Sequence, residues 1–451
     1  MSKSNGITWV SDSREGAPIV QRLRDEGLAV DYFVADPHYA KCFDGIIPRL
    51  TLAGLKNSLK KNDTVIFDIN KPNDKKPDAL KLLNYFGCKT NSEGVFGPIA
   101  DKLRRDHQVI CGGSYADHLE FDRMAGIALA KRLGLEVSEA KEFKTLADGI
   151  KFLTGKDQCY VLKLNNNVDL SLTYVEDDPG ELIAKMQGEL PGRLGNKPIE
   201  FILQEKVAGV EISTEAWFDG EDFVCWNHTL EDKRFLVGNL GINTGCQSNT
   251  TWMKEDEEGY LVKDMSKLKS YLRAADYVGC IDVNTIIGEE DGLPYFLEFT
   301  PRFGYSAIYC LLTLIPEGGL GNFFLNGFKF IPKAQYACSQ VISIPPYPSC
   351  SATDLGKMAK DVGMKNKLSQ LGDMWLQDVY QDDKGDLRCA GTDGLIGVMT
   401  ATGDTLEEAT GQMYKNIDKL KIYSDYQYRT DHLKSHTERL KDLKALGVNI
   451  S

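Results

Sequence analysis

Two carboxylates in the segment from Gly279 to Arg302 are spaced so that they could bind a metal ion. The segment has the pattern of two strands joined by an acidic turn, with Asp282 on the first strand and Glu298 on the second. We expect these two side chains to lie side by side. Ionised groups beside an apolar core repel each other unless a cation neutralises them, and a hard cation such as Mg²⁺ prefers oxygen ligands. The same spacing is equally typical of a hairpin whose Asp and Glu face water.

Two basic residues could complete such a site. Arg302 follows Glu298 by four residues, and its guanidinium group could hold a phosphate or carboxylate near the metal ion. Lys163 interrupts the apolar run from Tyr160 to Leu164. It is either an outward-facing residue of an edge strand or a point charge that reaches a nucleotide phosphate. Together these residues outline a nucleotide-phosphate site.

The first third of the chain alternates between strand and helix patterns, which predicts an α/β domain with a doubly wound parallel sheet. The strand candidates are residues 7–10, 30–35, 64–69 and 109–111, and the helical patterns are 17–26, 52–60, 79–86 and 99–105. Ligands of such sheets bind beyond the carboxyl ends of the strands. The turn from Ser11 to Gly16 follows the first strand, so it could receive an anion, although an ordinary capped helix start has the same pattern.

The middle and last thirds show a different organisation. Helical spacing from Tyr115 to Leu135 predicts one long amphipathic helix that leads into a strand-rich region, with strands at residues 201–207 and 211–218 around a turn at Gly209. A glycine-rich stretch at residues 318–327 and a proline-rich stretch at 345–348 indicate a boundary before a carboxy-terminal domain of mixed strands and helices.

Composition excludes several classes of protein. The chain has 451 residues, enough for about three domains, and 65 acidic against 53 basic side chains give a net charge of −12. This balance argues against nucleic acid as a partner. No secretory signal is visible at the start, and the longest apolar run, residues 308–316, is too short to cross a membrane. Eleven cysteines without a C-x-x-C pair suit a reducing compartment, so we expect a cytoplasmic protein.

Several motifs, in the correct order, resemble those of the ATP-grasp superfamily, and specifically of the phosphoribosylamine–glycine ligase family. Phe296-Leu-Glu-Phe-Thr-Pro-Arg-Phe-Gly304 is similar to that family's E-F-N-x-R-F-G run. Residues 201–213 resemble its adenine hinge. Asp232-Lys-Arg234 and Gly241-Ile-Asn-Thr-Gly245 resemble its D-H-K-R and G-P-N-T-G pair, and residues 403–409 and 428–431 resemble its closing domain. The resemblance covers essentially the whole chain.

The resemblance implies an ATP-dependent ligase that joins an amino acid to an amine through an acyl phosphate, with ATP and Mg²⁺ or Mn²⁺ bound, acting as a monomer or homodimer. The residues that it implies for the nucleotide are Arg123, Lys163, Gln204, Glu205, Val207 and Glu211. For the metal ion it implies Asp282, Glu298 and Thr300. For the substrates it implies Asp232, Lys233, Arg234, Asn243, Thr244, Gly245 and Arg302, and for catalysis Arg302 and Lys163.

The same resemblance implies three domains: an amino-terminal α/β substrate domain (1–114), a central ATP-grasp domain (115–328) with a small lid subdomain at about 124–203, and a mixed α+β carboxy-terminal domain (329–451). The chain departs from the family at Asn165 to Ser171, which lacks glycine, at Thr300, where the family has Asn, and at Ser11 to Gly16, which lacks the family's glycines and histidine. Our first hypothesis is therefore a ligase with a changed amine substrate. The alternative is a catalytically silent relative that binds a nucleotide or metabolite.

Overall fold

The amino-terminal part forms the predicted parallel sheet. The protein is described by a computed structural model that covers residues 4–164, 173–194, 199–254, 261, 265–349 and 354–449. The sheet has the strand order β2-β1-β3-β4, and all of its neighbours run parallel. Its strands are β1 (Ser4–Ser11), β2 (Val30–Val34), β3 (Asn62–Phe67) and β4 (Gln108–Ile110). They are short apolar runs, as is usual where helices cover a parallel sheet.

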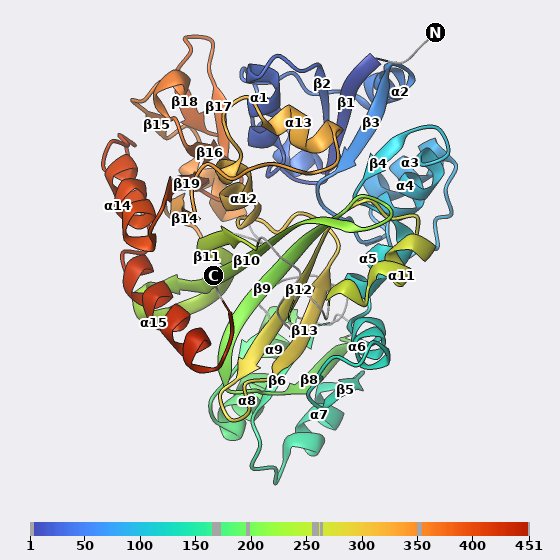
Figure 1. Ribbon diagram of the computed structural model, residues 1–451, viewed down its shortest axis with the longest axis vertical. Helices are drawn as coiled ribbons and strands as arrows, with labels where there is room; N and C mark the ends of the chain where they lie inside the picture. The colour runs from blue at the N-terminus through green and yellow to red at the C-terminus, as the bar shows by residue number, and fades with distance from the viewer. Residues whose placement is uncertain are drawn as a thin grey trace.

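Four helices alternate with these strands, which confirms the predicted order of elements (Figure 1). They are α1 (Ala17–Asp25), α2 (Leu52–Lys61), α3 (Pro77–Phe86) and α4 (Phe96–Leu103), and a short 3-10 helix, η1 (Pro37–Tyr39), follows β2. Local sequence explains their ends. The Thr51 hydroxyl accepts a hydrogen bond from the Gly54 amide at the start of α2, and Gly87 ends α3 with a φ of 63°.

The single helix expected from Tyr115 to Leu135 was a wrong prediction, because the structure has two helices there. They are α5 (Ser114–Phe121) and α6 (Arg123–Arg132). Asp122 between them has an extended backbone, and its carboxylate accepts a hydrogen bond from the Ala125 amide at 3.0 Å. Asp is a strong helix-capping residue, so it starts a new helix where the apolar spacing alone predicts a continuous one.

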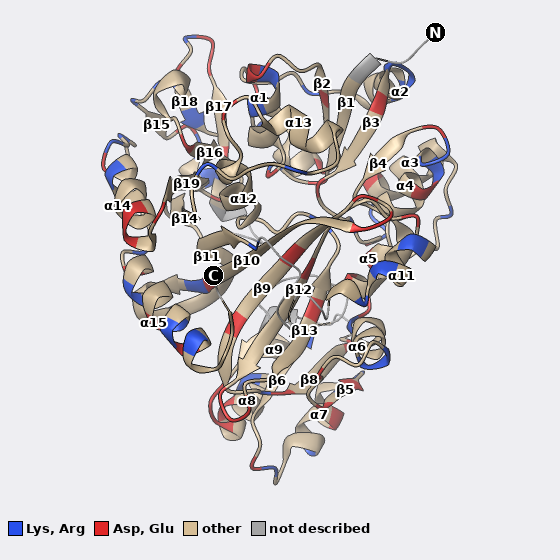
Figure 2. Cartoon of the chain, in the orientation of Figure 1, with Lys and Arg blue, Asp and Glu red and all other residues tan. Residues whose placement is uncertain are grey.

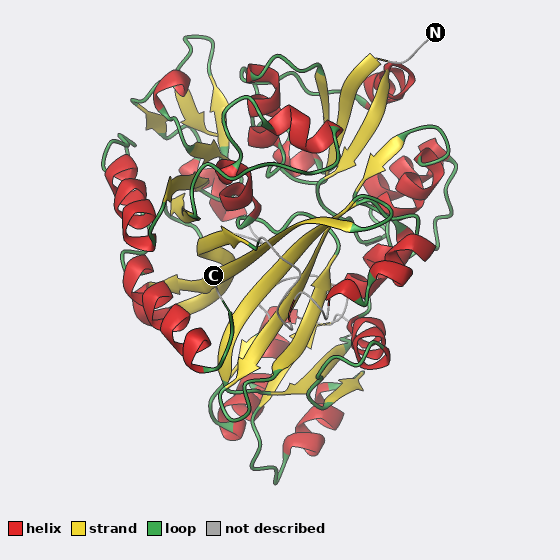
Figure 3. Cartoon of the chain, in the orientation of Figure 1, coloured by secondary structure: helices red, strands yellow, loops and turns green. Residues whose placement is uncertain are grey.

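An eight-stranded antiparallel sheet forms the centre of the molecule (Figure 3). Its order is β13-β12-β9-β10-β11-β14-β19-β16. The strands are β9 (Gly209–Phe218), β10 (Phe223–Leu236), β11 (Leu240–Met253), β12 (Gly279–Gly288), β13 (Pro294–Thr300), β14 (Tyr336–Ser343), β16 (Met374–Leu376) and β19 (Leu395–Gly403), with η4 (Val237–Asn239) between β10 and β11. The predicted boundary at residue 329 falls just before β14. Since β14 pairs with β11, segments on both sides of that boundary share one sheet.

A smaller sheet lies at one end of the molecule (Figure 1). Its strands are β5 (Ala140–Phe143), β6 (Tyr160–Leu164), β7 (Tyr174–Val175) and β8 (Phe201–Glu205), in the order β5-β8-β6-β7. The helices α7 (Leu146–Leu153), α8 (Pro179–Gln187) and α9 (Glu189–Leu194) accompany it. Phe143, Tyr160 and Phe201 belong to a separate apolar core in this region, as expected of a lid subdomain, whose bounds stay a prediction.

The remaining elements surround the central sheet. They are α11 (Lys269–Ala274), α12 (Ile308–Leu314), α13 (Leu320–Leu325), α14 (Leu406–Ile417), α15 (His432–Ala445), the 3-10 helices η5 (Asp354–Ala359) and η6 (Leu368–Gln370), and a small sheet of β15 (Gly363–Met364), β18 (Leu387–Cys389) and β17 (Val379–Gln381). Within the described ranges, each helix is too short or too polar to traverse a lipid bilayer. Every cysteine that the structure describes is a free thiol.

Aromatic side chains fix the amino-terminal sheet to the central sheet. The Phe303 ring lies 5.8 Å from Trp9 of β1 and 5.6 Å from Trp217 of β9, between ring centroids. Nearby, Gly279 at the start of β12 lies so close to β4 that a Cβ atom there would be 2.5 Å from the Cys111 Sγ. These tight contacts set the position of β12, the strand that carries Asp282, relative to the ends of the parallel strands.

Candidate active site

A cavity of about 490 Å³ brings together most of the predicted site residues. Its lining comes from the small sheet (β6, β7, β8), from the central sheet (β9, β10, β11, β12, β13), from the start of α6 and from the loops beside them. The predicted residues that line it are Arg123, Lys163, Gln204, Glu205, Val207, Glu211, Lys233, Asn243, Thr244, Gly245, Asp282, Glu298, Thr300 and Arg302. Figure 2 shows acidic positions on β9, β12 and β13 in this part of the central sheet.

The two carboxylates of the hairpin line this cavity, but the expectation that they lie side by side was wrong. In the register of β12 and β13, Asp282 is opposite Thr300, and Glu298 is opposite Asn284. The two carboxylates are therefore diagonal neighbours on one face of the sheet. Register depends on how the turn closes, here with an irregularity after Asn284, and residue spacing does not reveal it.

Asn284 is a cavity residue that the sequence analysis missed. It follows Asp282 by two residues on β12, so both side chains point to the same face, and this alternation could have indicated it. The amide Nδ2 donates to Asp282 Oδ2 at 2.9 Å, while Asn284 Oδ1 is buried without a hydrogen-bond partner in the structure. A buried oxygen without a donor suits a cation.

This arrangement fits a hard divalent cation. Burial raises the pKa of Asp282 to about 7, in spite of the hydrogen bond from Ser213, and a cation would favour the ionised carboxylate. Asp282, Glu298 and Asn284 offer oxygen ligands of the type that Mg²⁺ takes. The described residues contain no group of three His, Cys, Asp or Glu side chains arranged for a metal ion, so an amide or hydroxyl ligand would be needed. Thr300 also lines the cavity, and its role as a ligand stays a prediction.

Lys163 faces the cavity and is not an edge residue. Its strand, β6, lies between β8 and β7, and the side chain is buried. Its Nζ donates to Gln204 Oε1 at 3.0 Å, a neutral partner. Burial lowers the pKa of Lys163 to about 8, although the Glu298 carboxylate opposes this shift. The environment thus leaves a buried ammonium group whose charge a phosphate would stabilise.

Arg123 pairs with Glu298. Its Nη1 lies 2.6 Å from Glu298 Oε2, and its Nε donates to the Leu164 carbonyl at 3.1 Å. Burial alone would raise the pKa of Glu298, but the charges of Arg123, Lys163 and Lys233 lower it to about 2. Glu298 is therefore ionised at neutral pH, and a metal ion would share this carboxylate with Arg123.

Lys233 lies between two carboxylates of the cavity wall. Its Nζ binds Glu211 Oε1 and lies 3.5 Å from Glu231 Oε2. Glu231 was not predicted as a site residue, although its position two residues before Lys233 on β10 places both on one face.

Arg302 is also held by a carboxylate. Its Nη2 donates to Glu120 Oε1 at 2.8 Å, and Asn70 donates to the other carboxylate oxygen of Glu120.

Two of the predicted substrate residues are not brought into the cavity. Asp232 and Arg234 alternate with Lys233 on β10 and do not line it. The Asp232 carboxylate accepts hydrogen bonds from Ser248 (2.8 Å) and Ser435 (2.9 Å), and its Oδ2 lies 3.1 Å from His436 Nε2 and 3.7 Å from Arg429 Nη2. Asp232 thus fixes α15 and its preceding segment to the central sheet.

We expect Asp232→Ala to lower the free energy of unfolding by about 3–5 kcal/mol, because it leaves the buried Arg429 with fewer counter-charges. Urea unfolding measures this, with the exposed Asp425→Ala as the control. Unchanged stability together with weaker binding of a substrate would instead support the predicted substrate role of Asp232.

The turn after β1 is occupied by ion pairs within the protein. Arg14 Nη2 lies 2.7 Å from Asp393 Oδ2, and Asp12 Oδ1 lies 2.6 Å from Lys71 Nζ. Gly16 precedes α1 without a side-chain cap. The predicted anion site at Ser11 to Gly16 stays a prediction, and an anion there would compete with these pairs. The glycine-poor segment from Asn165 to Ser171 lies outside the described residues.

Comparison with known proteins finds sequences that are similar to this chain. No protein-family model matches the chain. Phosphoribosylamine–glycine ligase from Thermotoga maritima is 26% identical over 359 residues, which cover 76% of this chain and 81% of that protein. The enzyme of the same name from Helicobacter pylori (strain 26695) is 23% identical over 371 residues, 78% of this chain and 83% of that protein.

Solved structures show the same fold. The crystal structure of the Thermotoga maritima ligase superposes with a TM-score of 0.66 at 18% identity, covering 94% of this chain and 99% of that one. N5-carboxyaminoimidazole synthetase from Staphylococcus aureus gives 0.52 at 11% identity, covering 93% and 98%. The chain therefore has the ATP-grasp fold, and it is related in sequence to the phosphoribosylamine–glycine ligases.

Proposed function

We propose that this protein is an ATP-dependent ligase that activates a carboxylate as an acyl phosphate and joins it to an amine, with release of ADP and phosphate. The observation that carries the proposal is one cavity in which Lys163, Arg302 and the carboxylates Asp282 and Glu298 meet. Phosphoryl transfer depends on positioning and on neutralising charge, so these groups suit it without a nucleophilic side chain. The similarity to phosphoribosylamine–glycine ligases supports the same reaction class.

Each group has a specific task in this proposal. Lys163 binds phosphate oxygens of ATP, and the main chain from Glu205 to Val207 at the end of β8 binds adenine. Asp282 and Glu298, with Asn284 or Thr300, hold Mg²⁺, which when bound neutralises phosphate charge. Arg302, oriented by Glu120, holds the phosphorylated carboxylate. Gln204 holds the Lys163 ammonium group in place by accepting its hydrogen bond, until a phosphate oxygen accepts that hydrogen bond instead.

The amine substrate in this proposal differs from phosphoribosylamine. The lining of the cavity near the amino-terminal sheet includes Glu15, Ile69 and Tyr305. The cations closest in sequence to these residues, Arg14 and Lys71, are each paired with a carboxylate. A substrate phosphate would have to break such a pair and would meet the Glu15 carboxylate, so an amine without a phosphate fits better.

Release of ADP from Mg-ATP tests the proposal directly. The protein is assayed with glycine and phosphoribosylamine together, with each alone, and with a panel of other amino acids and unphosphorylated amines. We expect release only with an acid and an amine together, and with an unphosphorylated amine. ADP release that requires phosphoribosylamine would overturn the proposal that the amine substrate has changed, but it would support the proposed ligase reaction.

A silent relative that binds ATP without turnover is the second candidate. The ion pair between Arg123 and Glu298 favours it, because Arg123 neutralises the carboxylate that the ligase reserves for a metal ion. ATP binding without ADP release in the presence of any substrate pair would support this candidate and contradict the ligase.

ATP affinity should depend on pH through Lys163. Its pKa of about 8 means that the ammonium is charged below this pH and neutral above it, so we expect affinity to fall as the pH rises from about 7 to about 9. Isothermal titration calorimetry at several pH values measures this. Lys163→Arg keeps its charge over this range and should give a flatter profile. Equal slopes for both proteins would show that Lys163 does not contact the phosphates.

A further inference from the structure

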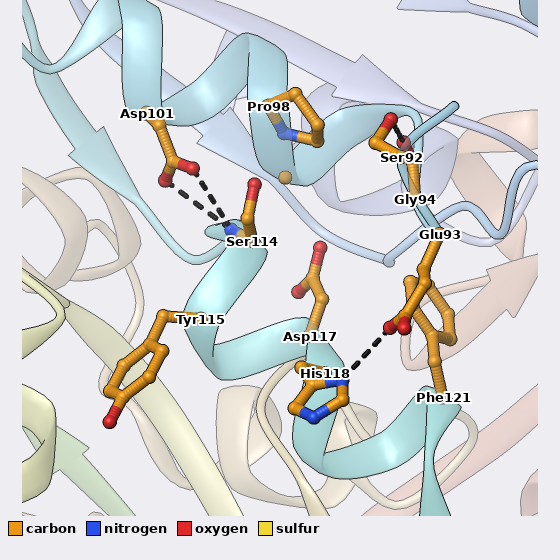
Figure 4. Close-up of a pocket in the computed structure, with 11 residues that line it drawn as sticks. Ser92, Glu93, Gly94, Pro98, Asp101, Ser114, Tyr115, Asp117, His118 and Phe121 are labelled. Carbon is orange, nitrogen blue, oxygen red and sulfur yellow. Dashed lines mark hydrogen bonds and ion pairs between the residues drawn. The ribbon is translucent and has the colours of Figure 1, made fainter. Parts of the chain in front are cut away.

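A second cavity, of about 380 Å³, lies between α4 and α5 and shares no lining residue with the candidate active site (Figure 4). Its wall comes from α4, from α5 and from the segment before α4. The lining residues are Ser92, Glu93, Gly94, Gly97, Pro98, Asp101, Ser114, Tyr115, Asp117, His118 and Phe121. The proposed ligase reaction uses none of them.

Asp117 of α5 is the unusual residue of this cavity. Its side chain is 1% exposed, and neither carboxylate oxygen has a hydrogen-bond partner in the structure. Figure 4 shows the carboxylate pointing away from α5, toward the middle of the residues that line the cavity. A buried carboxylate without a partner is costly, so one that lines a cavity indicates a ligand that supplies the missing donor.

The neighbours of Asp117 do not supply that donor. Burial raises the pKa of Asp117, and the like charges of Glu120 and Asp101, together with Cys111, raise it further. Arg104 is the nearby cation, and its Nη1 donates to Asp101 Oδ1 (3.1 Å) while its Nη2 donates to the carbonyls of Cys111 and Gly112. Its Nε is buried without a hydrogen-bond partner and does not donate to Asp117. At the rim, Glu93 accepts a hydrogen bond from His118 at 2.8 Å. The cavity is therefore acidic, and none of these neighbours donates a hydrogen bond to the Asp117 carboxylate.

We propose that this cavity binds a small organic cation with an apolar stem, whose ammonium or guanidinium group pairs with Asp117. Pro98, Tyr115 and Phe121 give the cavity an apolar wall that a hydrocarbon stem can contact. A metal ion is a poorer match, because the side chains of Pro98 and Phe121 in this wall offer it no ligand. Asp117 lies one helical turn from Glu120, the partner of Arg302.

Calorimetric titration with n-pentylammonium, with n-pentanol as the neutral analogue, tests this site in the absence of ATP, Mg²⁺ and substrates. Failure of the ligase proposal therefore leaves this result unaffected. We expect n-pentylammonium to bind the unmodified protein at least about tenfold more tightly than it binds the Asp117→Asn variant. This difference is the effect of losing a buried charge-assisted hydrogen bond. Binding of n-pentanol should be weak and equal in both. Equal binding of the cation to both proteins, or no binding to either, would overturn the proposal.

Two further measurements keep the test decisive. Glu93→Gln, at the exposed rim, should weaken binding less than Asp117→Asn, and the reverse order would refute the role of Asp117. In the unmodified protein, the cation pairs only with ionised Asp117. Burial raises the pKa of Asp117, Glu120, Asp101 and Cys111 raise it further, and Arg104 lowers it. Affinity for n-pentylammonium should therefore rise with pH while that for n-pentanol stays constant. A pH-independent affinity would also contradict the site, even if Asp117→Asn does not fold.

Discussion

Replacing Glu298 by Gln should reduce ADP release by about a hundredfold or more, the size of effect seen when one preorganised charged group is removed from an active site. Glu298 is ionised at neutral pH because Arg123, Lys163 and Lys233 hold its pKa at about 2. Gln has the same shape, but it carries no charge to bind Mg²⁺ and leaves Arg123 without the counter-charge that lies 2.6 Å away. Steady-state ADP release at saturating Mg-ATP measures the loss.

The controls for this variant separate chemistry from folding. Glu290→Gln changes an exposed carboxylate in the turn of the same hairpin, and it should leave both turnover and thermal unfolding unchanged. Glu298→Gln should still bind ATP in the absence of metal ions. Unchanged turnover in Glu298→Gln would refute the metal-binding assignment and would favour a structural ion pair between Arg123 and Glu298 with no catalytic part.

Lys163→Met should weaken ATP binding by about tenfold to a hundredfold, the equivalent of about 1.5–3 kcal/mol for a hydrogen bond to a charged group. Met fills nearly the same volume and removes the ammonium group. Because burial lowers the pKa of Lys163, the folded protein disfavours its charge, and its loss should not destabilise the fold. Calorimetric ATP titration and thermal unfolding measure the two effects.

Lys151→Met is the matched control for this experiment, since Lys151 is an exposed lysine of α7 in the same small region of the fold. It should change neither ATP affinity nor stability. If Lys163→Met instead lowers the unfolding temperature while ATP affinity stays the same, the role of Lys163 is structural, through its hydrogen bond to Gln204.

Local sequence was sufficient for the amino-terminal sheet and for most strands of the candidate site. The strand predicted at Tyr160 to Leu164 coincides with β6, and the alternating strands and helices before Cys111 appear in the predicted order. These elements are determined by short-range patterns: apolar runs, helical spacing and capping residues. The hairpin from Gly279 to Arg302 also formed as expected, and both of its carboxylates line the cavity.

Tertiary structure decided which side chains meet. The register of β12 and β13 placed Asn284, and not Asp282, opposite Glu298. The orientation of β10 turned Lys233 toward the cavity and Asp232 toward α15. Arg123 of α6 pairs with Glu298 of β13, a residue 175 positions further along the chain. Each of these outcomes depends on contacts between residues far apart in the chain. The energies of these contacts are summed over the whole packed core, and no short sequence pattern reveals them.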